Sequence, residues 1–410
     1  MSNRERRAHL SGIRVLHMSQ CEAGAACTEA LAWFGADVVK VENPKGGDPA
    51  RRSFGRPGLE DSWYFLLFNA NKRSLAIDVK SERGLQIIKD LARHADIFVE
   101  NFAPGVIERL GLGYEVLREC NPRLIYAQVK GFGPGSPNER TPAFDMIAQA
   151  TGGLYSITGA ADGPPTRLGV TLGDTGTGML LAISVLAALY RSEQTGEGER
   201  LQVAMQDAML QYMRVGFSAQ ALRNSPAPRV GNKLVSGANP PCGLYPCKPF
   251  GSNDYVCIYT SHNNPGHWRS LLTVIGRSDL VGDARYDTQA ARVEREAEVD
   301  ELLSTWCRQH DKFEAERLLG SAGVPAGAVR DTQELVNDPH FEDRGVMQVM
   351  QHPKNGSFKM PVWPVLHDGR PPGDVSPSPL LGQQSSEILQ DWLGLGDEDV
   401  SALRSDQIIV

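Results

Sequence analysis

The first evidence on the fold is the run Ile13-Arg-Val-Leu-His-Met18, which is followed by the small-residue loop Glu22-Ala-Gly24 and by Val38-Val-Lys-Val41. Both apolar runs are typical of buried strands. The residues between them, from Cys27 to Phe34, have helical spacing, and Gly35 is suited to end the helix. A strand, a helix and a strand within about 30 residues predict a βαβ unit with parallel strands and a right-handed crossover.

The same alternation of strand and helix signals continues to residue 130. The expected elements are strands at 74–78, 95–99 and 124–129, a helix at 82–93 and a helix that starts at Pro104. This alternation predicts a Rossmann-like, doubly wound α/β layer, whose ligands bind at the carboxyl ends of the strands. The residues expected at those ends are Glu22, Ala23, Asn101 and Phe102.

Changes in composition divide the chain into four parts. We expect a large α/β domain at residues 10–222, a linker rich in Pro, Asn, Gly and Ser at 223–241, and a smaller α+β domain at 242–332. Residues 333–410 are expected to return to the large domain and to end in a helix at 385–393. Within the large domain, Thr177–Ser192 is apolar almost all round and predicts a buried helix.

The composition is that of an ordinary globular protein. Of 410 residues, 41% are hydrophobic and 22% charged, which excludes disorder or coiled coil for the whole chain. A net charge of −7 without a Lys/Arg run argues against nucleic acid or a membrane as partner. The longest apolar run, Met179 to Leu189, is shorter than the about 20 residues of a membrane span. Seven dispersed cysteines and a start without a signal peptide predict a cytoplasmic protein with reduced thiols.

The most informative stretch is Leu172-Gly-Asp174-Thr-Gly-Thr-Gly178, directly before the apolar helix. From spacing alone, the commoner explanation is that Asp174 caps the helix N-terminus. In the alternative, Gly173, Gly176 and Gly178 let a bulky ligand approach the backbone. Free N–H groups at the helix start would then stabilise an oxyanion, and the Asp174 carboxylate would act as a nucleophile.

Other common site types are not predicted. Cys242 and Cys247 lack zinc-site spacing, and no G-x-G-x-x-G, P-loop or G-x-S-x-G motif is present. We therefore expect neither a metal nor a nucleotide cofactor, which also argues against a dinucleotide oxidoreductase.

A set of short motifs runs through the chain in a fixed order: Ala23-Gly24, Leu31–Glu42, Asn71–Ser74, Val99–Gly105, Lys130–Phe132, Leu172–Gly178 and Met205–Ala208. Together they resemble the class III CoA-transferases, the CaiB/BaiF family, and most closely the branch that uses formyl-CoA or acetyl-CoA with oxalate. The motifs occur in the family's order, and Leu380-Leu-Gly382 matches its C-terminal segment.

The resemblance implies transfer of CoA from a donor acyl-CoA to a carboxylic acid. Asp174 would attack the thioester to give a mixed anhydride and then an aspartyl-CoA thioester, with Asp145 and Glu22 in supporting roles. Neither ATP nor a metal is needed. As a nucleophile such an Asp needs no raised pKa, because at its ordinary pKa of about 3.9 it is already ionised at pH 7. The family's CoA contacts fall on Ala23, Asp78, Lys80, Asn101, Phe102 and Arg109, with Arg140 near a position where the family has Lys.

The resemblance also implies an interlocked homodimer with the active site at the interface. Two alternatives remain: a non-catalytic acyl-CoA-binding protein, and a 2-methylacyl-CoA racemase, which needs a histidine where this chain has Phe144. Glu22 stands where the oxalate branch has Gln, Asn43 where it has Arg, and residues 237–245 replace its glycine-run loop. The sequence does not identify the donor or the acceptor. A dicarboxylic acid, such as oxalate or succinate, is the prediction, because four cations could meet its second carboxylate: Arg214, Arg229, Lys233 and Lys248.

Overall fold

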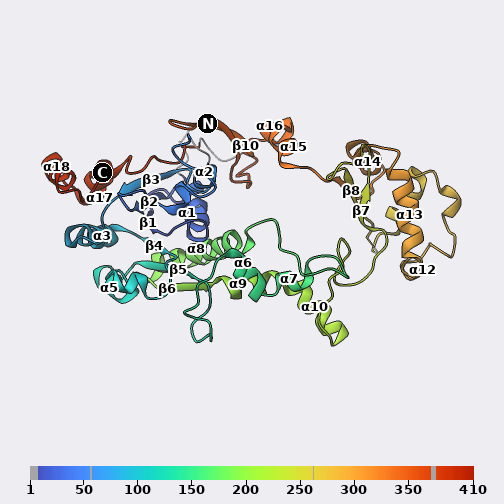
Figure 1. The fold of residues 1–410 in the computed structure, drawn as a ribbon, viewed down its shortest axis with the longest axis horizontal. Coiled ribbons are helices and arrows are strands. Elements are labelled where there is room, and N and C mark those ends of the chain that lie inside the picture. The colour runs from blue at the N-terminus through green and yellow to red at the C-terminus, as the bar shows by residue number, and fades with distance from the viewer. Residues whose placement is uncertain (1–7, 56–57, 262, 371–374) are drawn as a thin grey trace. The chain divides into compact units, whose positions relative to one another are not determined.

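A computed structural model describes residues 8–55, 58–261, 263–370 and 375–410. The chain forms two compact units (Figure 1). The first unit comprises Met1–Gly153, Leu168–Tyr212 and Pro339–Val410, and the second comprises Leu154–Arg167 and Met213–Asp338. The boundaries that composition suggested for a linker and a smaller domain remain a prediction.

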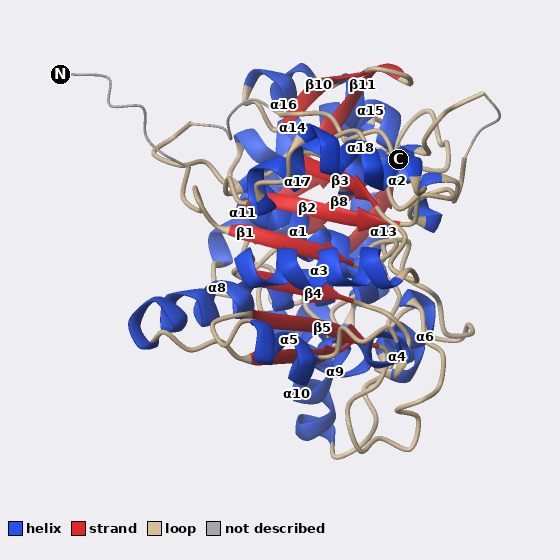
Figure 2. Cartoon of the chain, turned by 90° about the vertical axis from the view of Figure 1, so that its left-hand side faces the viewer, coloured by secondary structure: helices blue, strands red, loops and turns tan. Residues whose placement is uncertain are grey.

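The first unit is built on a six-stranded sheet with the strand order β3-β2-β1-β4-β5-β6 (Figure 2). All its neighbouring strands pair in parallel. The strands are β1 Arg14–Met18, β2 Asp37–Glu42, β3 Lys72–Ala76, β4 Ile97–Glu100, β5 Ile125–Lys130 and β6 Arg200–Ala204. The predicted doubly wound α/β layer is therefore confirmed. The strand order reverses between β1 and β4, so a ligand is expected beyond the carboxyl ends of these two strands.

Helices accompany the strands of the first unit. They are α1 Ala23–Trp33, α2 Trp63–Phe68, α3 Glu82–His94, α4 Val106–Arg109, α5 Tyr114–Cys120, α6 Asp145–Thr151, α8 Thr177–Thr195, α9 Met205–Tyr212, α16 Pro339–Asp343, α17 Ser385–Leu393 and α18 Asp397–Ser405. Helix α3 starts where the Ser81 side chain accepts the N–H of Gly84, and it buries Ile87, Ile88 and Leu91. The predicted helices at 82–93 and 385–393 are thus confirmed.

The C-terminal segment completes the core of the first unit. Ile388, Leu389 and Trp392 of α17 lie in the same buried cluster as Leu16 of β1 and Val39 of β2. Between residues 333 and 385 the segment also forms an antiparallel hairpin, β10 Met347–His352 with β11 Gly356–Pro361, which the proline-rich composition did not predict.

Helix α8 differs from its prediction as a fully buried helix. It packs against α1 and buries Leu181 and Val185, while Ile183 and Tyr190 are 65% and 70% exposed. With the preceding turn it forms a helical stretch, Leu172–Thr195, that is long and apolar enough to cross a membrane, so the length argument from Met179–Leu189 is wrong. Half of its apolar window is buried in the structure, and a single such helix is weak evidence for a membrane span.

The second unit has an antiparallel sheet in the order β7-β8-β9, formed by Cys242–Pro246, Tyr255–Tyr259 and Ala326–Ala328. Arg295 lies outside helical geometry and separates helix α12, Gln289–Glu294, from helix α13, Glu296–Cys307. The helices are α7 Leu154–Ile157, α10 Arg214–Arg223, α11 Pro265–Val274, α12 Gln289–Glu294, α13 Glu296–Cys307, α14 Lys312–Ser321 and α15 Thr332–Asn337.

Candidate active site

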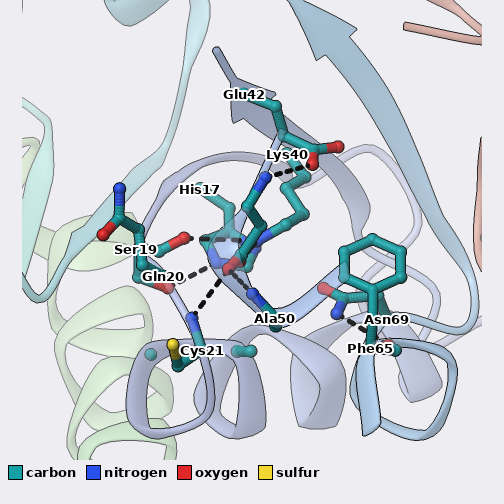
Figure 3. A network of polar contacts seen from close by, with 12 residues as sticks. His17, Ser19, Gln20, Cys21, Lys40, Glu42, Ala50, Phe65 and Asn69 are labelled. Atoms are coloured by element: carbon teal, nitrogen blue, oxygen red, sulfur yellow. Dashed lines mark hydrogen bonds and ion pairs between the residues drawn. The ribbon is translucent and has the colours of Figure 1, made fainter. Parts of the chain in front are cut away.

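The loop at residues 19–22, directly after β1, is held in place from β2. Lys40 is fully buried and donates to the Ser19 carbonyl oxygen at 3.2 Å and to Asp48 Oδ2 at 2.6 Å. Asp48 Oδ1 in turn accepts the N–H of Cys21 at 3.1 Å. Figure 3 shows the Lys40 side chain reaching toward this loop. Cys21 has a positive φ of 56°, so these contacts stabilise a backbone conformation that L-residues seldom adopt.

The same loop is also held from β4. Asn101 Oδ1 accepts the Gln20 N–H, and Asn101 Nδ2 donates to the Gln20 carbonyl oxygen, both at 2.7 Å. Asn101 was expected to contact CoA, and its side chain also fixes the wall of the strand crevice. Lys40 and Asp48 were not predicted as site residues, because a lysine within an apolar strand gives no sign of the carboxylate that it contacts.

Asp174 lies in a π-helical turn, Leu172–Gly176, that leads into α8. Its carboxylate accepts no hydrogen bond from the part of the chain that the structure describes, so the N-cap interpretation is wrong. Asp145 instead holds the turn: its Oδ1 accepts the N–H of Gly173 at 2.8 Å and that of Asp174 at 3.4 Å. Gln149 Nε2 donates to both Asp145 oxygens, at 3.0 and 2.8 Å.

Glu22 holds the other side of this turn. The hydroxyls of Thr171 and Thr175, which flank Asp174 in sequence, both donate to Glu22 Oε1. The Tyr64 hydroxyl donates to Glu22 Oε2 at 3.0 Å. Glu22 is only 1% exposed, and these three hydroxyl donors satisfy its carboxylate. Tyr64, Thr171 and Thr175 were not singled out from the sequence.

The surroundings of Asp174 raise the pKa of its carboxyl group to about 7. Burial is the largest cause, followed by the negative charges of Glu22 and Asp145. A nucleophile at this position was expected to need no raised pKa; the pKa of Asp174 is nevertheless raised, because the carboxyl group is largely buried and lies near two other carboxylates. Burial and Asp48 likewise raise the pKa of the neighbouring Cys21 thiol to about 11.

The glycines around Asp174 make room for protein rather than for a ligand. A Cβ at Gly173 would lie 2.7 Å from the Asp145 carbonyl oxygen, and one at Gly178 would lie 2.4 Å from the Ala23 carbonyl oxygen. The expected oxyanion donors are also occupied, since the N–H groups of Gly173, Asp174 and Thr175 all bond within the chain. This corrects two expectations: that the glycines let a bulky ligand approach the backbone, and that free N–H groups at the helix start stabilise an oxyanion.

A cavity of about 360 Å³ lies at the carboxyl ends of β1 and β4. Its wall includes the predicted site residues Glu22, Ala23, Asn101, Phe102 and Asp174. The only positive charge among the lining residues that the structure describes belongs to Lys130. Lys130 Nζ donates to both Glu100 oxygens at 2.6 and 2.9 Å and to the Phe102 carbonyl oxygen at 2.8 Å. Its three donors are thus engaged.

A second cavity of about 250 Å³ is lined by Asp78 and Lys80. Most of its other lining is apolar and includes Met18, Val41, Ile77, Val79 and Leu110. The two cavities share three wall residues: Gln20, Phe102 and Val106.

The remaining predicted residues lie outside these cavities. Arg109 and Arg140 are exposed and line neither cavity, and Asp145 lies behind the turn with 6% exposure. Phe144 lines the larger cavity where a racemase needs a proton-carrying histidine. Among the described residues, no group of three or more His, Cys, Asp or Glu side chains could hold a metal ion.

The four cations expected to meet a second carboxylate all belong to the second unit. Lys233 pairs there with Asp300 at 2.5 Å and with Glu296 at 3.1 Å. Arg229 donates to the carbonyl oxygens of Ser156 and Gly163 at 3.3 and 2.9 Å. These two cations are therefore engaged within their own unit.

A doubly wound sheet with a carboxylate-lined cavity at its strand reversal defines the class of α/β enzymes that bind a ligand at that crevice. The comparisons with known proteins identify the family. The model of CoA-transferase family III matches residues 10–385. The chain therefore belongs to CoA-transferase family III and is a CoA-transferase, which confirms the resemblance found in the motifs.

Relatives and solved structures agree with this assignment. The chain is 38% identical to a formyl-CoA:oxalate CoA-transferase of Streptomyces avermitilis, over 98% of this chain and 99% of the relative. It is 36% identical to one of Rhodopseudomonas palustris, over 96% of both chains. A CaiB/BaiF family protein from Brucella suis has a TM-score of 0.83 at 28% identity, covering 94% of this chain and 100% of that one. Rv3272 from M. tuberculosis has a TM-score of 0.78 at 29% identity, with 93% and 99% covered.

Proposed function

We propose that the protein moves CoA from a donor acyl-CoA to a carboxylic acid through covalent intermediates on Asp174. The observation that carries this proposal is the placement of the Asp174 carboxylate. It lies on a cavity wall, it accepts no hydrogen bond from the described residues, and the turn that bears it is fixed on both sides by Glu22 and Asp145. A carboxylate that is held in place but left unpaired is suited to attack an electrophile in the cavity.

The first half of the reaction charges the enzyme. A carboxylate oxygen of Asp174 attacks the thioester carbonyl carbon, the C–S bond breaks, and CoA thiolate leaves behind a mixed anhydride. The thiolate then attacks the Asp174 carbonyl carbon, and the donor acid departs as its carboxylate. In the second half, the acceptor carboxylate attacks the aspartyl-CoA thioester and runs these steps in reverse. Every step exchanges one acyl bond for another, so no oxidant or phosphate donor is required.

The charges around Asp174 favour its acylation. While the carboxylate is free, it is repelled by Glu22 and Asp145, which is part of the reason for its raised pKa. In the anhydride or thioester the side chain carries no charge, so this repulsion is relieved. A carboxylate of raised pKa is also a stronger nucleophile once it is ionised.

The two cavities are suited to hold the two ends of CoA. We assign the adenosine to the smaller, largely apolar cavity beside Asp78 and Lys80, and the thioester to the larger cavity at Asp174. The pantetheine arm would pass the shared wall at Gln20 and Phe102, next to Ala23 and Asn101. The exposed Arg109 and Arg140 would pair with phosphates from the surface.

Assembly and location follow the family expectation. We propose a cytoplasmic homodimer, supported by apolar side chains that each unit leaves exposed, such as Tyr190 of α8 and Leu222 of α10, at 70% and 76%. Among the acids, the dicarboxylic class, such as oxalate or succinate, stays a prediction that rests on the second unit's cations. The names of the relatives point to oxalate, whereas the charge of Glu22, argued below, favours the longer succinate.

The test compares Asp174→Asn and Asp174→Ala with wild type and with Asp90→Asn, a control on the surface of α3. CoA transfer between acids is followed by mass spectrometry of the CoA products, and acyl-CoA binding by calorimetry. We expect both Asp174 variants to lose at least about a thousandfold in transfer rate while acyl-CoA still binds, because the nucleophile is gone and the cavity is not. Wild-type turnover in Asp174→Asn would refute the mechanism.

A further inference from the structure

The reacting end of the larger cavity carries an unbalanced negative charge. Glu22 and Asp174 both line it, and the one positively charged lining residue that the structure describes, Lys130, is engaged by Glu100. Once Asp174 is converted to its CoA thioester, Glu22 still carries its charge at this wall. The wall around Asp174 therefore offers an incoming acid one fixed negative charge and no unpaired cation.

Three contacts fix the Glu22 carboxylate in this position. Thr171, Thr175 and Tyr64 each direct a hydroxyl donor at it, an arrangement that suits a group that only accepts hydrogen bonds. Turning away would cost the side chain these three hydrogen bonds in a partly buried place. The carboxylate is consequently held at the acyl end of the cavity.

An acceptor acid must bring its reacting carboxylate into contact with the carbonyl carbon of Asp174. In oxalate the second carboxylate is bonded directly to the reacting one, so it has to enter the same end of the cavity beside Glu22. In acetate or propionate there is no second charge, and in succinate two methylene groups separate the two carboxylates. The Glu22 carboxylate is near enough to repel that of Asp174, and repulsion between like charges is strong in partly buried surroundings.

We propose that Glu22 is a specificity-determining residue that selects acids with no second carboxylate adjacent to the reacting one. This proposal rests on the proposed function and names the class of its substrates. Monocarboxylates and longer diacids such as succinate fit it, whereas oxalate does not.

The experiment measures transfer from one donor acyl-CoA to acetate, propionate, succinate and oxalate, with wild type, Glu22→Gln and Glu22→Asp. The readout is the ratio of kcat/KM for oxalate to that for acetate. In the wild type we expect kcat/KM for oxalate to be at least about tenfold lower than kcat/KM for acetate. In Glu22→Gln, which removes the charge and nearly keeps the shape of the side chain, we expect the ratio to rise about ten- to a hundredfold. Asp145→Asn is the matched control, because Asp145 lies behind the turn and does not line the cavity.

Oxalate as the best acceptor of the wild type would overturn the proposal, as would a ratio that Glu22→Gln leaves unchanged or that Asp145→Asn raises equally. If Glu22→Gln is inactive, the wild-type panel and Glu22→Asp, which keeps the charge and should keep the low ratio, decide the matter. If the wild type transfers CoA to no acid at all, the proposed function is refuted instead. Failure of the specificity proposal and failure of the proposed function are therefore distinguishable.

Discussion

Asp174, Glu22 and Asp145 form a group of three carboxylates in which only one is left to react. Glu22 and Asp145 accept hydrogen bonds from the hydroxyls and N–H groups of the turn that carries Asp174. They position Asp174, the proposed nucleophile, and at the same time raise its pKa. In the free enzyme Glu22 and Asp145 therefore repel the carboxylate of Asp174, and the proposed covalent intermediate relieves this repulsion.

The pH dependence of the reaction follows from this arrangement. Asp174 must be ionised to attack, and its pKa is about 7, so kcat/KM for the acyl-CoA should fall about tenfold per pH unit below pH 7 and level off above it. Glu22→Gln removes one source of repulsion and should move the midpoint to lower pH. A wild-type profile that stays flat down to about pH 5 would contradict the raised pKa.

The same shift predicts how Asp174 affects stability. Its pKa is raised from 3.8 to about 7, so the folded protein binds the proton more tightly than the unfolded chain does. The resulting penalty is absent below about pH 4, grows as the pH rises to 7 and is complete above it. Asp174→Asn should therefore increase the free energy of unfolding by up to about 4 kcal/mol at pH 8 and by far less at pH 4.

Urea unfolding at both pH values measures this effect. Equal changes at the two pH values would mean that the charge of Asp174 is not the cause.

Sequence motifs predicted some of the site residues and could not predict others. Asp174 stands in the motif Leu172–Gly178, and Glu22 was placed at the carboxyl end of a predicted strand, so both were expected in the site. Tyr64, Thr171 and Thr175 are ordinary residue types, and they reach Glu22 from 42, 149 and 153 positions away in the chain. Their role, and with it the pKa of Asp174, depends on tertiary contacts that no local pattern records.

At the scale of elements, the buried pair of Lys40 and Asp48 joins strand β2 to the loop after β1. Both side chains are almost fully buried, at 0% and 3% exposure. A buried ion pair contributes little net stability, but removing one partner leaves a charge that nothing compensates. The pair therefore acts as a constraint on the loop at 19–22 and on the start of α1.

Asp48→Ala should lower the free energy of unfolding by about 3–5 kcal/mol, because Lys40 is left as a buried, unpaired charge. The double variant Lys40→Met with Asp48→Asn should recover most of this loss, since it removes both charges and keeps an acceptor for the Cys21 N–H. Denaturant unfolding compares the two. If the double variant is as unstable as Asp48→Ala, burial of the charge does not explain the effect.

The fold of the first unit was more accessible to prediction than its site. Apolar runs such as Ile13–Met18 and Val38–Val41 are local signals, and they marked strands of the parallel sheet correctly. Helix α8 was predicted as buried because its composition is apolar, yet exposure depends on what lies opposite each face. The hairpin β10–β11 was missed, because proline-rich flanking sequence conceals two short strands.

At the scale of the whole molecule, the proposed dimer gives a direct prediction. Light scattering should report twice the 44.7 kDa chain mass, and dilution to the nanomolar range should not change it, because interlocked chains cannot separate without unfolding. A mass that falls to that of one chain on dilution would exclude an interlocked dimer.

The central claim is that CoA becomes covalently attached to Asp174 during turnover. The most direct measurement is to mix the enzyme with its acyl-CoA donor, quench it in acid, digest it and weigh the peptide that contains Asp174. In the wild type this peptide should carry the added mass of CoA and lose that mass on treatment with hydroxylamine. The corresponding peptide of Asp174→Asn should carry no added mass. A peptide without added mass at every time point, in an enzyme that transfers CoA, would contradict it.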